Sequence, residues 1–105
     1  MTGRAFSFAD PFAYESVTVS TSTNGYALSS TTYASTATDP AAVATLTLDG
    51  GAIRYRIDGG IPSTALGHLM SVGDSLTLSG YLAISQFKAY AQTSTAGTLH
   101  ATYEK

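Results

Sequence analysis

The sequence contains no cysteine and no tryptophan, and only 11% of its 105 residues are charged. Without cysteine the chain can form neither a disulfide framework nor a thiolate zinc site, and it has no cysteine nucleophile. A formal net charge of -2 provides no basic field to attract phosphate groups, so no nucleic-acid partner is expected. These absences leave packing and hydrogen bonds to hold the fold together.

Long apolar runs are also missing. No stretch reaches the roughly 18 continuous apolar residues of a membrane-spanning helix, and the N-terminal sequence Met-Thr-Gly-Arg-Ala-Phe lacks the apolar run of a signal peptide. We therefore expect no membrane partner, and a product that is made in a cytoplasm and is not exported by a visible route.

Large aliphatic side chains are scarce, whereas hydroxyl side chains are abundant. Serine and threonine together number 29, and leucine, isoleucine, valine and phenylalanine together number 21. A chain of this length forms one domain with a modest core, and its surface must be rich in hydroxyl groups. A core this lean predicts that neighbouring subunits supply part of the stability of the assembled protein.

Apolar and polar residues alternate through most of the chain, between Gly, Asp and Pro turn signals. This pattern predicts an all-β fold, a small antiparallel β-sandwich or partly open barrel of about seven strands. The expected strands lie near residues 15–20, 26–33, 42–49, 52–58, 75–79, 82–91 and 98–103.

The same alternation predicts which side chains face the core. The sequence Asp49–Gly51 predicts a tight hairpin between the two strands that flank it. Along residues 82–91 the apolar residues change from even-numbered to odd-numbered positions, so a β-bulge is expected near Ser85–Gln86. The predicted inward residues are Leu46, Leu48, Ile53, Tyr55, Ile57, Leu82, Ile84, Phe87, Ala89, Ala91, Leu99, Ala101 and Tyr103.

The first fourteen residues carry aromatic side chains but no turn-bounded strand pattern. We interpret residues 1–14 as an N-terminal extended arm and residues 15–105 as the β-sandwich domain. Four aromatic side chains argue against an arm left free in water, so the arm is expected to bind a partner. A frayed terminus or a short edge strand is the alternative. The candidate partner-binding residues are Phe6, Phe8, Phe12 and Tyr14.

Residues suited to acid–base catalysis are few and are not clustered. Asp58, Ser63 and His68 lie near one another in the sequence, but no nucleophile elbow accompanies them. A polar turn explains these residues better than a catalytic triad does. We therefore expect no enzyme activity, no cofactor and no small-molecule substrate.

Three aspartates at the ends of expected strands raise calcium binding as an alternative: Asp49, Asp58 and Asp74. They lack an Asp-x-Asp spacing, and Asp-Gly turns are common in β proteins. Ordinary turn chemistry is the favoured interpretation, and no metal site is predicted.

Arg54 and Arg56 are candidate interface residues because they project from one face of an expected strand. They either hold an acidic neighbour or, as the favoured interpretation, pair across strands with an acid such as Glu104. Several tyrosines could also form a stacking platform for a sugar, although tyrosine is a common residue of strands and interfaces. These tyrosines are Tyr14, Tyr26, Tyr33, Tyr81 and Tyr90.

Three stretches carry a family resemblance: AIRYRIDGGIPSTALGHL at residues 52–69, GDSLTL at 73–78 and TLHATYEK at 98–105. Together they resemble small virion proteins of tailed bacteriophages, in which an IRYR-DG-P-T strand and turn precedes GH-L, a GDSLTL-type strand and TLH-TY. The matches cover roughly the last half of the chain. This sequence departs from the pattern by placing Ser63 between the proline and the threonine.

The resemblance implies a bacteriophage structural protein located in the virion. Its most specific form is a capsid decoration or cement protein that binds and stabilises the head surface without catalysis. The expected partners are the major capsid protein or other virion proteins, with a homo-oligomer on the particle. A tail, adaptor or fibre-associated component is the first alternative. A similar IRY-DG-P turn in β-sandwich modules of sugar-degrading enzymes makes a carbohydrate-binding module the second.

Overall fold

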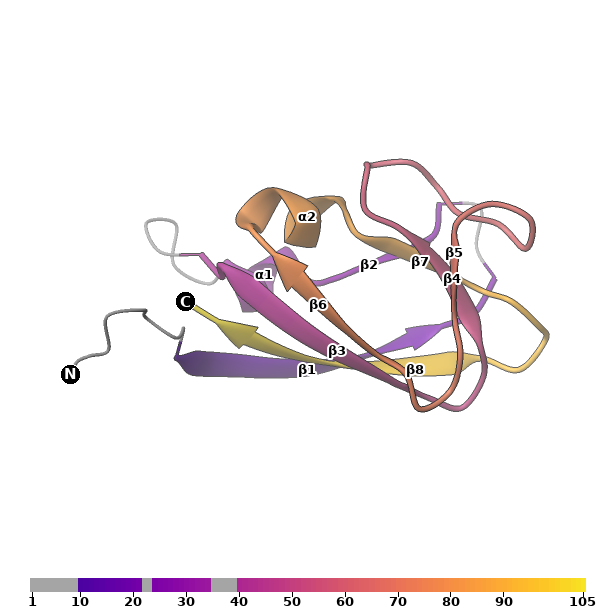
Figure 1. Ribbon diagram of the computed structural model, residues 1–105, viewed down its shortest axis with the longest axis horizontal. Coiled ribbons are helices and arrows are strands. Elements are labelled where there is room, and N and C mark those ends of the chain that lie inside the picture. Colours follow the sequence, from indigo (N-terminus) through magenta and orange to yellow (C-terminus); the bar gives the residue numbers. More distant parts are fainter. Residues whose placement is uncertain (1–9, 22–23, 35–39) are drawn as a thin grey trace.

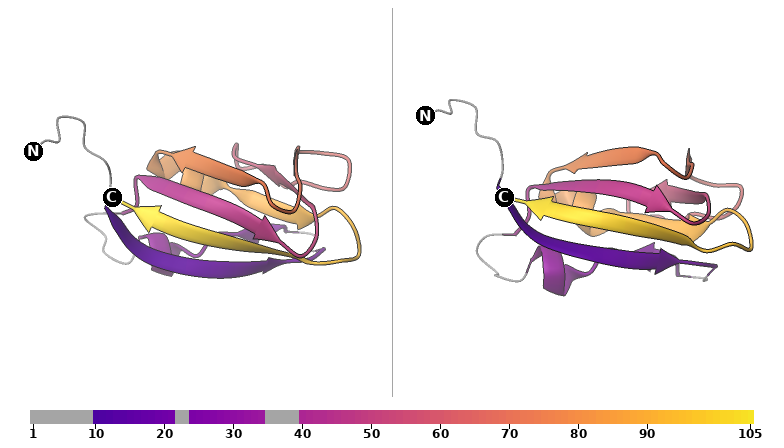
Figure 2. Two further views of the ribbon diagram at one scale, coloured as in Figure 1. Left: turned by 60° about the horizontal axis from the view of Figure 1, so that its bottom comes forward. Right: turned by 90° about the horizontal axis from the view of Figure 1, so that it is seen from below.

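Two four-stranded antiparallel sheets pack face to face in the computed structural model (Figure 1, Figure 2), which confirms the predicted all-β sandwich. The structure describes residues 10–21, 24–34 and 40–105. Its elements are β1 (Pro11–Val19), β2 (Tyr26–Ala27), α1 (Ser30–Tyr33), β3 (Val43–Asp49), β4 (Ile53–Arg56), β5 (His68–Met70), β6 (Ser75–Ser79), α2 (Tyr81–Gln86), β7 (Lys88–Ala91) and β8 (Gly97–Glu104).

The strands are divided between a large sheet, in the order β1-β8-β3-β6, and a small sheet, in the order β2-β7-β4-β5. From β3 to β8, every connection except the one between β4 and β5 crosses from one sheet to the other. The last strand, β8, lies inside the large sheet, where Leu99 is opposite both Val17 and Leu48. The large sheet therefore joins the two ends of the described chain.

Inward-facing side chains of both sheets form the core, and most of the predicted positions are confirmed. Ile57 and Leu82 are exceptions, with 40% and 65% of their surface exposed. β4 ends before Ile57, and Leu82 lies in a helix rather than a strand. The predicted inward residues found buried are Leu46, Leu48, Ile53, Ile84, Phe87, Ala89, Ala91, Leu99, Ala101 and Tyr103.

The connection Asp49–Gly51 is not a hairpin, which corrects the prediction. Both sides of β3 are occupied by β6 and β8, so the chain crosses to the small sheet, where β4 pairs with β5 and β7. Gly50 has a positive φ of 86°, which glycine adopts without strain. The crossing lies against the β7–β8 connection, because a Cβ on Gly50 would be 2.8 Å from the carbonyl oxygen of Ala96.

Helix α2 replaces the first half of the predicted strand 82–91, and the bulge predicted at Ser85–Gln86 is wrong. The helix begins after Gly80 and ends at Gln86, and the N–H of the next residue, Phe87, donates to the carbonyl oxygen of Ile84 at 3.4 Å. One helical turn, rather than one extra strand residue, changes which of the alternating side chains face the core. The helix covers the end of the sandwich beside β6 (Figure 1).

Two further predicted boundaries change. The strand predicted over residues 26–33 ends at Ala27, and α1 follows because the N–H groups of Thr32 and Tyr33 both donate to the carbonyl oxygen of Ser29. An eighth strand, β5, was not predicted. It has only three residues, too few for a period of two to be recognised.

The N-terminal strand begins earlier than predicted. β1 includes Phe12 and Tyr14, which were assigned to the arm, and Phe12 packs against the core. Asp10 and Lys105 exchange two backbone hydrogen bonds of 3.0 and 3.1 Å, which extend the pairing of β1 with β8. The predicted boundary between residues 14 and 15 therefore falls inside a strand. Phe6 and Phe8 lie outside the described residues.

Candidate protein-interaction surface

Strand β4 carries two arginines on the outer face of the small sheet. Ile53 is fully buried and Tyr55 packs against the core, so the alternating residues Arg54 and Arg56 point outward, as predicted. The register places Arg54 between Tyr90 of β7 and Leu69 of β5, and it places Arg56 opposite Lys88. We call the five outward residues of these strands the basic face: Arg54, Arg56, Leu69, Lys88 and Tyr90.

The guanidinium group of Arg54 is held by two neutral acceptors. Its Nε donates to Oε1 of Gln92 at 2.8 Å, and its Nη1 donates to the carbonyl oxygen of Gly67 at 2.9 Å. The favoured pairing with Glu104 is wrong, because Glu104 lies on β8 in the other sheet. Arg54 is therefore fixed in orientation, and no carboxylate among the described residues forms an ion pair with it.

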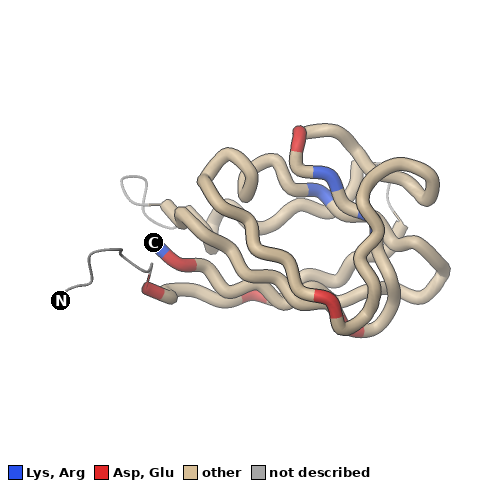
Figure 3. Tube along the Cα trace, in the orientation of Figure 1, with Lys and Arg blue, Asp and Glu red and all other residues tan. Residues whose placement is uncertain are grey.

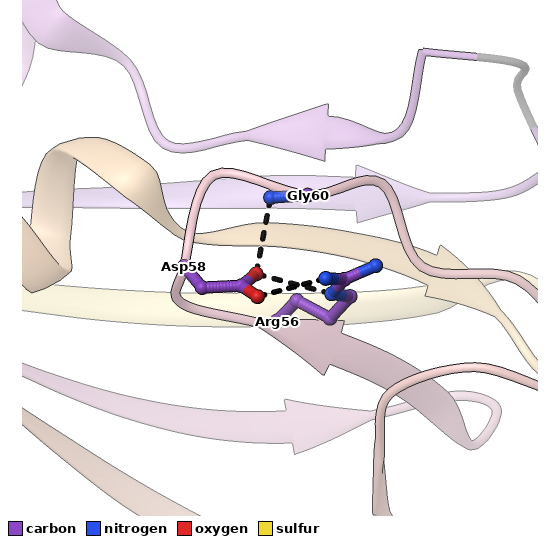
Figure 4. Close-up of polar contacts among 3 residues, drawn as sticks. All are labelled: Arg56, Asp58 and Gly60. Atoms are coloured by element: carbon purple, nitrogen blue, oxygen red, sulfur yellow. Dashed lines mark hydrogen bonds and ion pairs between the residues drawn. The ribbon is translucent and has the colours of Figure 1, made fainter.

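Arg56 forms a two-bond ion pair with Asp58 (Figure 4). Its Nε and Nη2 donate to Oδ1 and Oδ2 of Asp58 at 3.0 and 2.7 Å. The N–H of Gly60 also donates to Oδ1, at 3.0 Å. These contacts lower the pKa of Asp58 to about 2, and the hydrogen bond from the Arg56 guanidinium has the largest effect. The pair closes the turn after β4 and offsets part of the charge on the basic face.

Asp58, Ser63 and His68 each have a different partner, so they do not form a triad in the described structure. Asp58 is bound to Arg56, Oγ of Ser63 accepts from the N–H of Ala65 at 3.2 Å, and the ring of His68 packs on Tyr55 with 5.3 Å between centroids. A depression of about 340 Å³ lies beside them. It is lined by Arg56, Ile57, Asp58, Gly67 and His68.

The three aspartates considered for calcium binding also have separate partners. Asp49 contacts His100, Asp58 contacts Arg56, and Oδ2 of Asp74 accepts from the N–H of Ser71 at 2.9 Å. Residues 10–21, 24–34 and 40–105 contain no group of three or more His, Asp or Glu side chains arranged to hold a metal ion.

A three-residue polar network lies on the outer face of the large sheet, and the sequence did not predict it. Oη of Tyr14 is 2.6 Å from Nδ1 of His100, and Nε2 of His100 is 3.2 Å from Oδ2 of Asp49. One tautomer serves both contacts: Nδ1 accepts from the hydroxyl and Nε2–H donates to the carboxylate. The network ties β1 to β8 and β3. The predicted inward positions of Leu99 and Ala101, which place His100 on the opposite face, were the only sequence signal for it.

The candidate tyrosines do not form one platform. Tyr33 is buried, while Tyr14 and Tyr90 belong to different sheets. Tyr81 packs edge-on against Tyr33, with 5.9 Å between centroids, and the hydroxyl of Tyr26 lies 2.7 Å from Oγ of Ser20. A flat sugar-stacking surface that contains all five side chains is therefore excluded.

Exposed apolar side chains concentrate around β5, the edge strand of the small sheet. Leu69 lies on β5 with 54% of its surface exposed, and it adjoins Arg54 on the basic face. Exposed apolar side chains beside arginine and tyrosine are typical of protein–protein interfaces. We call residues 57–72, which include β5, the exposed apolar segment. Its large exposed apolar residues are Ile57, Ile61, Leu66, Leu69 and Val72.

Charge is divided between the two layers of the sandwich (Figure 3). Among the described residues, the small sheet carries three cations, with Asp58 as the acid beside them. The other layer consists of the large sheet, the residues that flank it and Lys105. Its acidic residues are Asp10, Glu15, Asp49, Asp74 and Glu104.

Comparisons with other proteins add no family to this description. The chain matches no protein-family model, no curated protein sequence and no solved structure. Neither helix in the described part of the chain has the length and apolar character needed to cross a membrane.

Proposed function

We propose that this chain is a structural protein of a bacteriophage virion, and specifically a capsid decoration or cement protein. In this role it binds the major capsid protein or a neighbouring virion protein, assembles with further copies on the particle and stabilises the head without catalysis. The motifs at residues 52–69, 73–78 and 98–105 supply the family resemblance for this proposal.

The observation that carries the proposal is the exposed apolar segment around β5. Its apolar side chains are exposed on a surface that is otherwise rich in hydroxyl groups, and β5 leaves one backbone edge of the small sheet unpaired within the described chain. An attachment protein needs such surface, because a stable contact removes apolar area from water and gives the open edge a partner. The β-sandwich supports this surface with a rigid core.

The experiment compares particles that carry the chain with particles from a strain in which its coding sequence is deleted. We expect electron microscopy to locate the chain on the head surface. We also expect heads without it to release their DNA at a lower temperature, as measured with a dye that binds free DNA. Density confined to the tail would assign the chain to the alternative tail or adaptor role, and absence from the particle would overturn the proposal.

A further inference from the structure

Repulsion between like charges on the basic face lowers the stability of the isolated molecule. Arg56 and Lys88 are directly opposite each other on β4 and β7, and two cations at such positions repel. Asp58 offsets the charge of Arg56. In the described part of the chain no ion pair neutralises Lys88 or Arg54. An arrangement that costs stability in the free chain is explained if a partner supplies the missing negative charge.

Arg54 is already oriented for such a partner. The two bonds to Gln92 and Gly67 use two of the five N–H donors of the guanidinium group, and both acceptors are neutral. The side chain therefore loses little conformational freedom when it binds a carboxylate, and its charge is available for that contact. Leu69 and Tyr90 flank it, which places aliphatic and aromatic surface next to the cation.

We propose that the basic face, together with the adjoining β5 edge, is the surface on which this chain docks onto an acidic protein surface with an apolar centre. Arg54 and Tyr90 are of residue types enriched in interface hot spots, and Leu69 adds exposed apolar surface beside them. The division of charge sets the orientation, because the large-sheet layer carries the acids and is repelled by the same partner. This inference rests on the proposed function for the identity of the partner, a virion protein.

The test uses the full chain and particles from the deletion strain. Lys88→Gln and Leu69→Glu each lower the net charge by one on the basic face, and Thr77→Glu makes the same charge change on the exposed face of β6. We expect the two basic-face variants to bind particles about three- to tenfold more weakly and Thr77→Glu to bind within about twofold of the unmodified chain. Equal losses for all three variants would overturn the inference.

A second measurement does not depend on the particle. Poly-L-glutamate is titrated into the isotopically labelled chain, and amide chemical shifts are followed by NMR. We expect the changes to cluster on β4, β5 and β7 and to disappear as salt is raised. Changes centred on the large sheet, or tighter binding of a DNA duplex than of poly-L-glutamate, would overturn the assignment. If the chain binds no particle but this titration succeeds, the proposed function fails and the docking surface stands.

Discussion

The hydroxyl group of Tyr103, a side chain with no exposed surface, donates a hydrogen bond to the carboxylate of Glu15 on the neighbouring strand. The same carboxylate oxygen accepts from the N–H of Ser29 at 3.0 Å. Glu15 thus joins β1, β8 and the residue that precedes α1. It gives the buried hydroxyl its acceptor, and stability depends on that acceptor.

Removal of the carboxylate should destabilise the fold. Glu15→Ala leaves the Tyr103 hydroxyl buried without its acceptor, which costs about 1–3 kcal/mol of unfolding free energy. Glu15→Gln retains an acceptor oxygen and should lose less. The measurement is urea unfolding, with Glu104→Ala on the outward face of β8 as the control. A loss for Glu104→Ala as large as that for Glu15→Ala would contradict the argument.

The buried tyrosine also predicts a loss of stability in alkali. Burial, followed by the hydrogen bond to Glu15, raises the pKa of Tyr103 above its usual value of 10.0. Above that pH the unfolded chain releases the Tyr103 proton while the folded chain keeps it, so the unfolding free energy falls as pH rises. Melting temperatures measured from pH 8 to 11 should show this decline. The decline should be smaller in Tyr103→Phe, and an identical decline would contradict the assignment.

Asp58 should titrate far below an ordinary aspartate. Its pKa is lowered from 3.8 to about 2, first by the bond to Arg56. The stabilisation is therefore present above pH 4 and is lost as pH falls through about 2. NMR titration of the carboxyl carbon should give this midpoint in the native chain and a higher one in Arg56→Gln.

Two glycines with similar backbone angles should respond differently to alanine. Gly50 and Gly73 have φ of 86° and 93°, so a side chain strains both. A Cβ at Gly73 would meet no atom within 4 Å, whereas one at Gly50 would lie 2.8 Å from the carbonyl oxygen of Ala96. Gly73→Ala should cost about 1 kcal/mol and Gly50→Ala at least about 2 kcal/mol. Equal melting temperatures for the two variants would rule out the close approach at Gly50.

Truncations should separate the N-terminal residues from the strand that follows. Deletion of residues 1–9 leaves β1 intact, so the chain should still unfold cooperatively. Deletion of residues 1–14 removes Phe12 from the core and Tyr14 from its contact with His100, so the melting temperature should fall clearly. If residues 1–9 act as a partner-binding arm, the shorter deletion should still lower occupancy on the particle.

The sequence predicted the sandwich because its longer strands alternate cleanly. β3 and β8 have hydroxyl residues on one face and Leu46 or Leu99 on the other, and such a pattern depends only on local geometry. The pairing of strands is not local. Asp49–Gly51 has the composition of a hairpin, yet the competing pairing of β3 with β6 and β8 sends the chain across to the other sheet.

The candidate surface was predictable only in part. Arg54 and Arg56 were found because they occupy alternate positions that point outward from the strand. Lys88 was not singled out, although it lies on the same face. Its outward position follows from the alternation in Lys88–Ala91. The network of His100 with Tyr14 and Asp49 joins residues 86 and 51 positions away in the sequence. Sequence spacing alone contains no sign of such contacts.

The central position of β8 has a consequence for synthesis. β8 is the last of the eight described strands to be made, yet it separates β1 from β3 and pairs with both of them. A ribosome that has not reached residue 97 therefore holds a chain whose large sheet cannot close, with the edges of β1 and β3 open to other nascent chains. Closure of the large sheet must wait for β8, and folding is slowed further because so many strand pairings are between distant residues. A stop codon before residue 97 would leave a chain prone to aggregation.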